Sequence, residues 1–74
     1  MTLGMLLRGI VLQGNVHISV WEEGDEQPSK EEWFEYIDGS NKPLYWAKKN
    51  KLLTKRVNWV FSQNDYLHIE TIDD

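Results

Sequence analysis

The C-terminal part of this chain alternates apolar and polar residues on both sides of a polar cluster. Residues 57–72 read VNWVFSQNDYLHIETI, with Gln63, Asn64 and Asp65 near the middle. Alternation with a period of two is typical of strands that bury one face, and the polar cluster is typical of a tight turn. The pattern therefore predicts a β-hairpin at this end of the fold.

The register of the hairpin depends on the length of its loop. Residues that lie opposite each other in an antiparallel pair point to the same face of the sheet. A two-residue turn at Asn64-Asp65 sets Phe61 against His68 and mixes core with surface. We therefore expect a three-residue loop of residues 63–65, which pairs Phe61 with Leu67. The expected core face is Val57, Trp59, Phe61, Leu67 and Ile69, with Trp59 opposite Ile69, and the expected outer face is Asn58, Val60, Ser62, Tyr66, His68 and Glu70.

The N-terminal half predicts a helix followed by a strand. Apolar residues recur at helical spacing from Leu3, so we expect a helix over Leu3 to Ile10, with Thr2 as its N-cap. The stretch Asn15 to Glu22 alternates and predicts a half-buried strand. The apolar residues that carry the two patterns are Leu3, Leu6, Leu7, Ile10 and Val11 for the helix, and Val16, Ile18 and Val20 for the strand.

The middle of the chain admits two interpretations. Ser29 followed by Glu32 matches a capping box, which favours a helix that runs toward Gly39. The segment EWFEYIDG is short and aromatic, which favours a strand. We expect a strand over Trp33 to Asp38. Residues 44–46 are expected to add a few strand residues, and residues 48–53 are expected to form one helical turn.

These elements predict a single small α+β domain over residues 1–74. A short N-terminal helix is expected to pack on an antiparallel sheet of about four strands that ends in the β-hairpin. The chain has no cysteine, no apolar run long enough for a bilayer and no signal-peptide pattern. We therefore expect a soluble cytoplasmic protein that does not contact a membrane.

Charge is distributed unevenly along the chain, whose net charge is −4. Residues 22–38 are strongly acidic, with Lys30 as their one basic residue, whereas every charged residue from Lys42 to Arg56 is basic. Oppositely charged segments either lie against each other or face different partners.

The segment LQGNVHISVWEE at residues 12–23, together with the C-terminal VNWVFSQNDYLHIETI, resembles a group of short uncharacterised proteins. These proteins are carried by phages and mobile elements of Gram-positive bacteria, and they end in a similar aromatic hairpin. The resemblance covers both ends of the chain and implies an accessory protein of a mobile element. It implies no catalytic or binding residues.

No residue pattern predicts a catalytic centre or a cofactor. His17 and His68 would approach each other, with Glu70 nearby, only if the first and last strands were neighbours. We expect both histidines to be solvated and expect no metal site. The acidic residues of the 22–35 segment are expected to form a solvated loop rather than a carboxylate pair for acid–base catalysis.

Nine aromatic residues are many for so small a core, and they carry the functional expectation. We expect a non-enzymatic interaction module that binds a protein partner or a second copy of itself through exposed aromatic and acidic residues. The expected protein-binding residues are Trp21, Glu22, Glu23, Trp46 and Tyr66. The alternative is a nucleic-acid-binding factor that uses Tyr45, Trp46, Lys48, Lys49, Lys51, Lys55 and Arg56.

Overall fold

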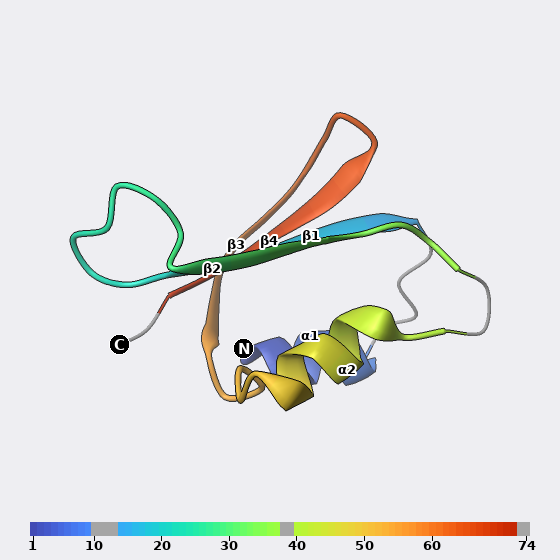
Figure 1. The fold of residues 1–74 in the computed structure, drawn as a ribbon, viewed down its shortest axis with the longest axis horizontal. Helices are drawn as coiled ribbons and strands as arrows, with labels where there is room; N and C mark the ends of the chain where they lie inside the picture. The colour runs from blue at the N-terminus through green and yellow to red at the C-terminus, as the bar shows by residue number, and fades with distance from the viewer. Residues whose placement is uncertain (10–13, 38–39, 73–74) are drawn as a thin grey trace.

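The fold is a four-stranded sheet with two short helices against one of its faces (Figure 1). The computed structural model describes residues 1–9, 14–37 and 40–72. The elements in chain order are α1 (Leu3–Gly9), β1 (Asn15–Trp21), β2 (Lys30–Phe34), α2 (Lys42–Lys49), β3 (Arg56–Gln63) and β4 (Tyr66–Ile72).

The strands lie in the order β2-β1-β4-β3, and the sheet is mixed. β1 pairs with β2 and β3 pairs with β4 in antiparallel fashion, whereas the central strands β1 and β4 are parallel. The predicted α+β class, the four strands and the closing hairpin are confirmed. The prediction of a purely antiparallel sheet is wrong, because the chain crosses beneath the sheet through α2 before it enters the β3–β4 hairpin (Figure 1).

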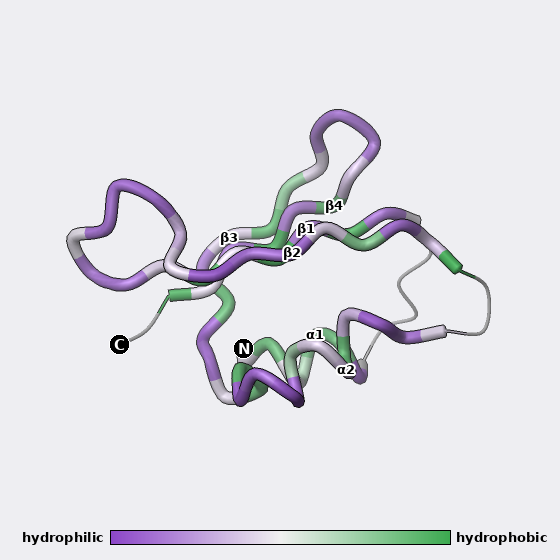
Figure 2. The backbone as a smooth tube through the Cα atoms, in the orientation of Figure 1, coloured by the Kyte–Doolittle hydropathy of each residue, from purple (hydrophilic) through white to green (hydrophobic). Residues whose placement is uncertain are grey.

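The hydrophobic core lies between the helices and the sheet, where the apolar segments of both layers face each other (Figure 2). It is formed by Leu3, Leu7, Val16, Ile18, Val20, Phe34, Ala47, Leu52 and Ile69, all of them buried. The predicted strand residues Val16, Ile18 and Val20 all belong to this set. Of the predicted helical stripe, Leu3 and Leu7 are buried and Leu6 packs against the core partly buried, while Ile10 and Val11 lie outside the described residues. Burial of these side chains supplies the main favourable free energy of folding.

Both helices begin with recognisable caps. The backbone N–H of Met5 donates to Thr2 Oγ1 at 3.2 Å, so the predicted N-cap of α1 is confirmed. α2 begins after Asn41, whose side chain accepts from the Leu44 N–H at 3.2 Å, and Pro43 occupies its first turn. The expected strand at residues 44–46 is therefore wrong, and the helical turn expected at residues 48–53 lies too late in the chain.

β2 is a strand, as expected, but it begins earlier than the sequence pattern indicated. The strand spans Lys30–Phe34 instead of Trp33 to Asp38, and Asp38 lies outside the described residues. The capping-box helix is wrong, because Ser29 Oγ donates to Val20 O at the start of the β1–β2 pairing. Charged residues occupy β2 because it is an edge strand, where they are tolerated and discourage further strand pairing.

The β3–β4 hairpin has a two-residue turn, so the expected three-residue loop is wrong. Asn64 and Asp65 have φ angles of 54° and 66°, and Phe61 lies opposite His68. Positive φ at both turn residues matches the twist of the flanking strands. The register is also irregular between Val57 and Trp59, where Asn58 is an extra residue on β3.

This irregularity reverses the alternation of β3. Val57 lies opposite the buried Thr71 and faces the helices, whereas Trp59 and Phe61 lie opposite Glu70 and His68 and face away from them. The expected core face is therefore wrong for Trp59 and Phe61, and the expected outer face is wrong for Val60 and Ser62. It is correct for Tyr66, His68 and Glu70, which alternate along β4 with Leu67, Ile69 and Thr71.

The turn also offers a substitution that should stabilise the protein. Replacing Asp65 with glycine should raise the free energy of unfolding by about 0.5 kcal/mol, because glycine adopts the left-handed conformation without a steric cost. Urea unfolding followed by tryptophan fluorescence measures the change. Glu26→Gly is the matched control, because Glu26 lies in an exposed loop without a positive φ and its replacement should only cost chain entropy. A lower stability of Asp65→Gly would contradict the assigned turn.

Candidate functional site

The face of the sheet opposite the two helices carries both histidines together with several carboxylate and aromatic side chains. In the part of the chain that the structure describes, neither helix covers this face, which we call the helix-free face (Figure 1). Register places on it the residues opposite the non-core positions of β1. They include Glu31 and Trp33 from β2, His17, Ser19 and Trp21 from β1, Tyr66, His68, Glu70 and Ile72 from β4, and Arg56, Trp59 and Phe61 from β3.

Aromatic rings stack on the two histidines at the centre of the helix-free face. The Trp33 ring lies 3.7 Å from the His17 ring, centroid to centroid, with 18° between the planes. Phe61 stacks on His68 at 4.8 Å, and Tyr66 contacts Trp33 edge-on at 5.1 Å. Trp33 nevertheless remains 50% exposed and Trp59 60% exposed. The face thus combines a packed centre with large apolar side chains that still contact water.

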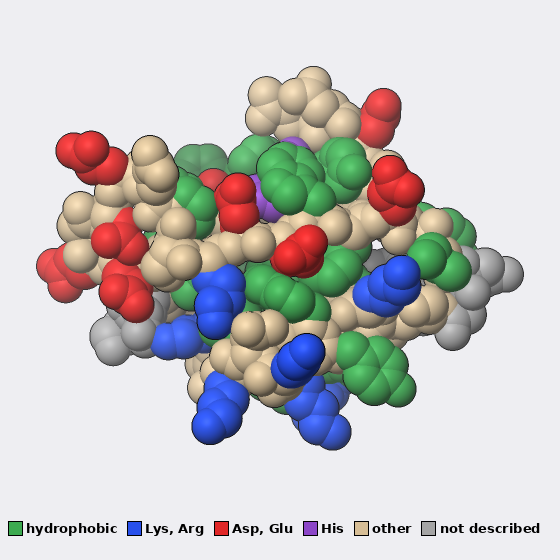
Figure 3. All heavy atoms as spheres, viewed as in Figure 1, with side chains coloured by type: hydrophobic (Ala, Val, Ile, Leu, Met, Phe, Trp, Pro, Cys, Tyr) green, Lys and Arg blue, Asp and Glu red, His purple; other side chains and the backbone are tan. Residues whose placement is uncertain are grey.

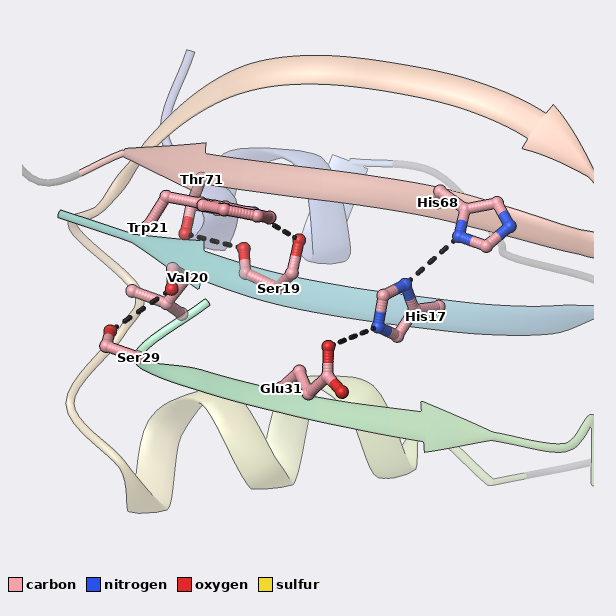
Figure 4. A network of polar contacts seen from close by, with 8 residues as sticks. All are labelled: His17, Ser19, Val20, Trp21, Ser29, Glu31, His68 and Thr71. Carbon is pink, nitrogen blue, oxygen red and sulfur yellow. Dashed lines mark hydrogen bonds and ion pairs between the residues drawn. The ribbon is translucent and has the colours of Figure 1, made fainter. Parts of the chain in front are cut away.

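His17 and His68 lie side by side, because β1 and β4 are neighbours and these two residues are register partners. Their Nδ1 atoms are 3.0 Å apart (Figure 4). His17 Nε2 lies 3.3 Å from Glu31 Oε2, and His68 Nε2 lies 3.0 Å from the backbone oxygen of Gln63. The expectation that both histidines are solvated is wrong for His17, which is only 9% exposed. Across the described ranges, no three side chains of His, Cys, Asp or Glu converge as metal ligands.

Burial lowers the pKa of His17, because the imidazolium form loses hydration beneath the Trp33 ring. The hydrogen bond to the Glu31 carboxylate and its charge oppose this shift, and the nearby His68 adds to it. The net effect favours a neutral His17 ring, which is the form that donates through one nitrogen and accepts through the other.

Ser19, next along β1, is buried although it lies on the helix-free face. Trp21 Nε1 donates to Ser19 Oγ at 3.0 Å, and the Trp21 side chain extends back over that residue (Figure 4). The Thr71 hydroxyl donates to the Ser19 carbonyl oxygen at 3.2 Å and ties β4 to β1. Trp21 is therefore held in a fixed position beside the acidic β1–β2 loop.

An acidic cleft of about 440 Å³ lies at this end of the sheet. Three of the predicted protein-binding residues, Trp21, Glu22 and Glu23, line it together. The other lining residues are Gly24, Asp25, Asn58, Glu70, Thr71 and Ile72. The chain thus concentrates carboxylates next to an aromatic ring, a combination that suits a cationic ligand.

The remaining two predicted protein-binding residues lie elsewhere. Tyr66 is on the helix-free face but contacts Trp33 rather than the cleft. Trp46 belongs to α2, packs edge-on against Phe34 with ring centroids 5.7 Å apart, and borders the core. Sequence reasoning missed Trp59 as a surface residue, because it expected a three-residue loop and the observed two-residue turn places Trp59 opposite Glu70. Trp33 was predicted only as part of a strand, without an assigned face.

Most basic residues of the alternative site gather on the opposite side of the molecule, whereas Arg56 lies opposite Ile72, the register partner of Trp21, and so belongs to the helix-free face. Lys and Arg side chains lie along the helix layer, whereas Asp and Glu side chains lie over the β1–β2 loop and the sheet (Figure 3). Lys48 and Lys49 end α2, with Tyr45 72% exposed on the same helix, while Lys51, Lys55 and Arg56 follow toward and into β3. Trp46 is packed inward, so Tyr45 is the aromatic residue of this set that is open to stacking.

No protein-family model, no curated protein and no solved structure matches this chain. The resemblance to proteins of phages and mobile elements therefore stays a prediction. Neither described helix has the length and apolar character needed to cross a membrane.

Proposed function

We propose that this protein is a non-enzymatic interaction module that binds a cationic segment of a protein partner on the helix-free face. The observation that carries the proposal is the presence of two half-exposed tryptophans, Trp33 and Trp59, on a sheet face that also carries Glu31 and Glu70. Tryptophan dominates the binding energy of many protein interfaces, because it supplies a large rigid surface.

Charge complementarity supports a cationic partner. The acidic cleft with Trp21, Glu22, Glu23 and Glu70 adjoins the same face and extends its negative character. Arginine and lysine side chains stack on aromatic rings and pair with carboxylates, so both features of the face favour the same ligand chemistry. A nucleic acid would be repelled from this side of the molecule.

Deca-arginine peptide is a suitable probe, with binding measured by isothermal titration calorimetry. We expect the Trp33→Ala and Trp59→Ala double variant to bind it about tenfold more weakly or worse, in line with the loss of two interface tryptophans. Tyr45→Ala is the matched control, because Tyr45 is an exposed aromatic residue on the opposite layer. Equal affinity of the double variant and the control would contradict the proposed surface.

The acidic contribution is tested separately. The triple variant Glu22→Gln, Glu23→Gln and Glu70→Gln should weaken peptide binding and make it less sensitive to salt, because it removes three charges from the cleft with little change in shape. Circular dichroism verifies the fold of each variant. An affinity that does not change would exclude the cleft from the binding surface. A pull-down from nuclease-treated lysate with wild-type and triple-variant bait then identifies the natural partner.

A second candidate function, nucleic-acid binding, is favoured by the exposed Tyr45 beside Lys48 and Lys49 on α2. Basic side chains neutralise phosphates, and an exposed aromatic ring stacks on a base. The net charge of −4 weighs against it. Binding of a single-stranded oligonucleotide that weakens steeply with salt and is lost in Lys48→Gln, Lys49→Gln and Lys51→Gln would favour this function over the first.

A further inference from the structure

His17 and His68 present one ring nitrogen each to a common point on the helix-free face. The two Nδ1 atoms are 3.0 Å apart and belong to register partners on parallel strands, so the backbone holds the pair in place. These are the chain's two histidines, and the chain has no cysteine. No other imidazole or thiolate therefore competes with this pair for a cation.

The hydrogen bonds on the far side of each ring determine which nitrogen carries the proton. The Gln63 backbone oxygen can only accept, so His68 Nε2 is the donor in their 3.0 Å contact. An ionised Glu31 carboxylate likewise accepts from His17 Nε2. A neutral imidazole has a single N–H, so each Nδ1 atom is left with a lone pair directed toward the other ring. A cation bound between the two Nδ1 atoms would satisfy both lone pairs.

A metal ion fits this position. In a histidine that binds a metal through one ring nitrogen, the other nitrogen donates its N–H to a carboxylate or a backbone carbonyl, as Nε2 of both rings does here. Because the hydrogen bonds at Nε2 leave both Nδ1 atoms unprotonated, a metal ion can bind the two rings in their neutral form.

The spacing of the two nitrogens favours one class of metal. Bonds of about 2.05 Å to two atoms 3.0 Å apart enclose an angle of about 94°. This angle is close to the right angle of tetragonal Cu²⁺ and Ni²⁺ sites and is smaller than the tetrahedral angle that Zn²⁺ adopts. Cu²⁺ also forms the most stable complexes of the divalent first-row ions.

We propose that His17 and His68 form a two-imidazole binding site for a divalent transition-metal ion, with preference for Cu²⁺. Glu31 and the Gln63 carbonyl are the positioning groups that orient the two rings. No third protein side chain among the described residues completes the site, so water occupies the remaining coordination positions. The proposal does not depend on the protein partner, and a failure of peptide binding would leave it unaffected.

Titration of the metal-free protein with Cu²⁺ in a non-coordinating buffer at neutral pH tests the site. Isothermal titration calorimetry should give one ion per chain, and electron paramagnetic resonance should show nitrogen coupling from two imidazoles. We expect His17→Gln and His68→Gln each to weaken Cu²⁺ binding about tenfold or more, and Glu31→Gln to weaken it by up to about tenfold. Zn²⁺ should bind more weakly than Cu²⁺ to the wild-type protein.

Two controls separate this site from adventitious binding. Glu26→Gln removes an exposed carboxylate remote from the pair and should leave the Cu²⁺ affinity unchanged. The double variant His17→Gln/His68→Gln measures what the chain terminus and surface carboxylates bind, and thermal unfolding shows whether it folds. If it is unfolded, His68→Gln serves instead, because His68 is the more exposed ring. A wild-type affinity equal to that of the folded variant, or an electron paramagnetic resonance spectrum without imidazole nitrogen coupling, would overturn the proposal.

Discussion

Replacing Ile18 with alanine should lower the free energy of unfolding by about 2–5 kcal/mol, the largest effect that we expect from a single substitution in this chain. Ile18 has no exposed surface and lies on the central strand β1, opposite Ile69, which is also fully buried. The truncation removes apolar contacts and leaves a cavity that rigid neighbours on both sides cannot fill. Small domains typically have a free energy of unfolding of about 5–15 kcal/mol, so this single substitution should remove a large part of it.

Urea unfolding, followed by tryptophan fluorescence, measures this effect against Val60→Ala. Val60 lies on β3 opposite Ile69 but is 44% exposed, so its truncation should cost less than about 1 kcal/mol. If Ile18→Ala does not fold, Ile18→Val should still lose about 0.5–1.5 kcal/mol. Equal losses at positions 18 and 60 would contradict the assigned core.

The second large effect is expected at Gly4, where helix propensity and packing oppose each other. Alanine favours a helix over glycine by about 1 kcal/mol, so propensity alone predicts a gain in stability. A Cβ atom at Gly4 would, however, lie 2.9 Å from the Leu53 carbonyl oxygen and 3.2 Å from Leu53 Cβ. The Gly4 N–H donates to that same oxygen at 2.8 Å, which fixes both backbones in place. We therefore expect Gly4→Ala to destabilise the protein by about 1–3 kcal/mol.

Thermal unfolding distinguishes the two effects at Gly4. Met5→Ala is the control on the same helix, because Met5 is exposed and its truncation should change the stability by less than about 0.5 kcal/mol. A Gly4→Ala variant that melts at a higher temperature than the wild type would show that helix propensity dominates and that α1 is able to move away from Leu53.

Local patterns predicted the elements that depend on neighbouring residues. The helical spacing at Leu3 and the Thr2 cap identified α1, and the alternation from Asn15 identified β1. The same approach failed at α2, although Asn41 followed by Pro43 is a recognisable helix start. The aromatic residues of the 44–46 segment favour a strand by propensity, but the Asn41 cap and Pro43 begin a helix there.

Features that depend on distant residues could not be predicted. The bulge at Asn58 and the two-residue turn together reverse which side chains of β3 face the helices, and alternation alone contains no sign of either. The histidine pair forms because β1 and β4 are neighbours, and the sequence does not determine which strands are neighbours. Trp21, Glu22, Glu23 and Tyr66 were therefore predicted as site residues from the sequence, whereas Trp33, Trp59 and the grouping of all of them at one side of the sheet were not.

The parallel pairing of β1 with β4 has a consequence for the order of folding. Each of these strands belongs to an antiparallel pair formed with a neighbour in sequence, and the two pairs meet only along the β1–β4 boundary. His17 and His68, which face each other across this boundary, are 51 residues apart in the chain. Closing so long a loop lowers the chain entropy before the β1–β4 contacts form. The two local pairs should therefore form first, and their association should limit the folding rate. The nuclear magnetic resonance signals of the two histidine rings would then show when β1 and β4 pair during folding.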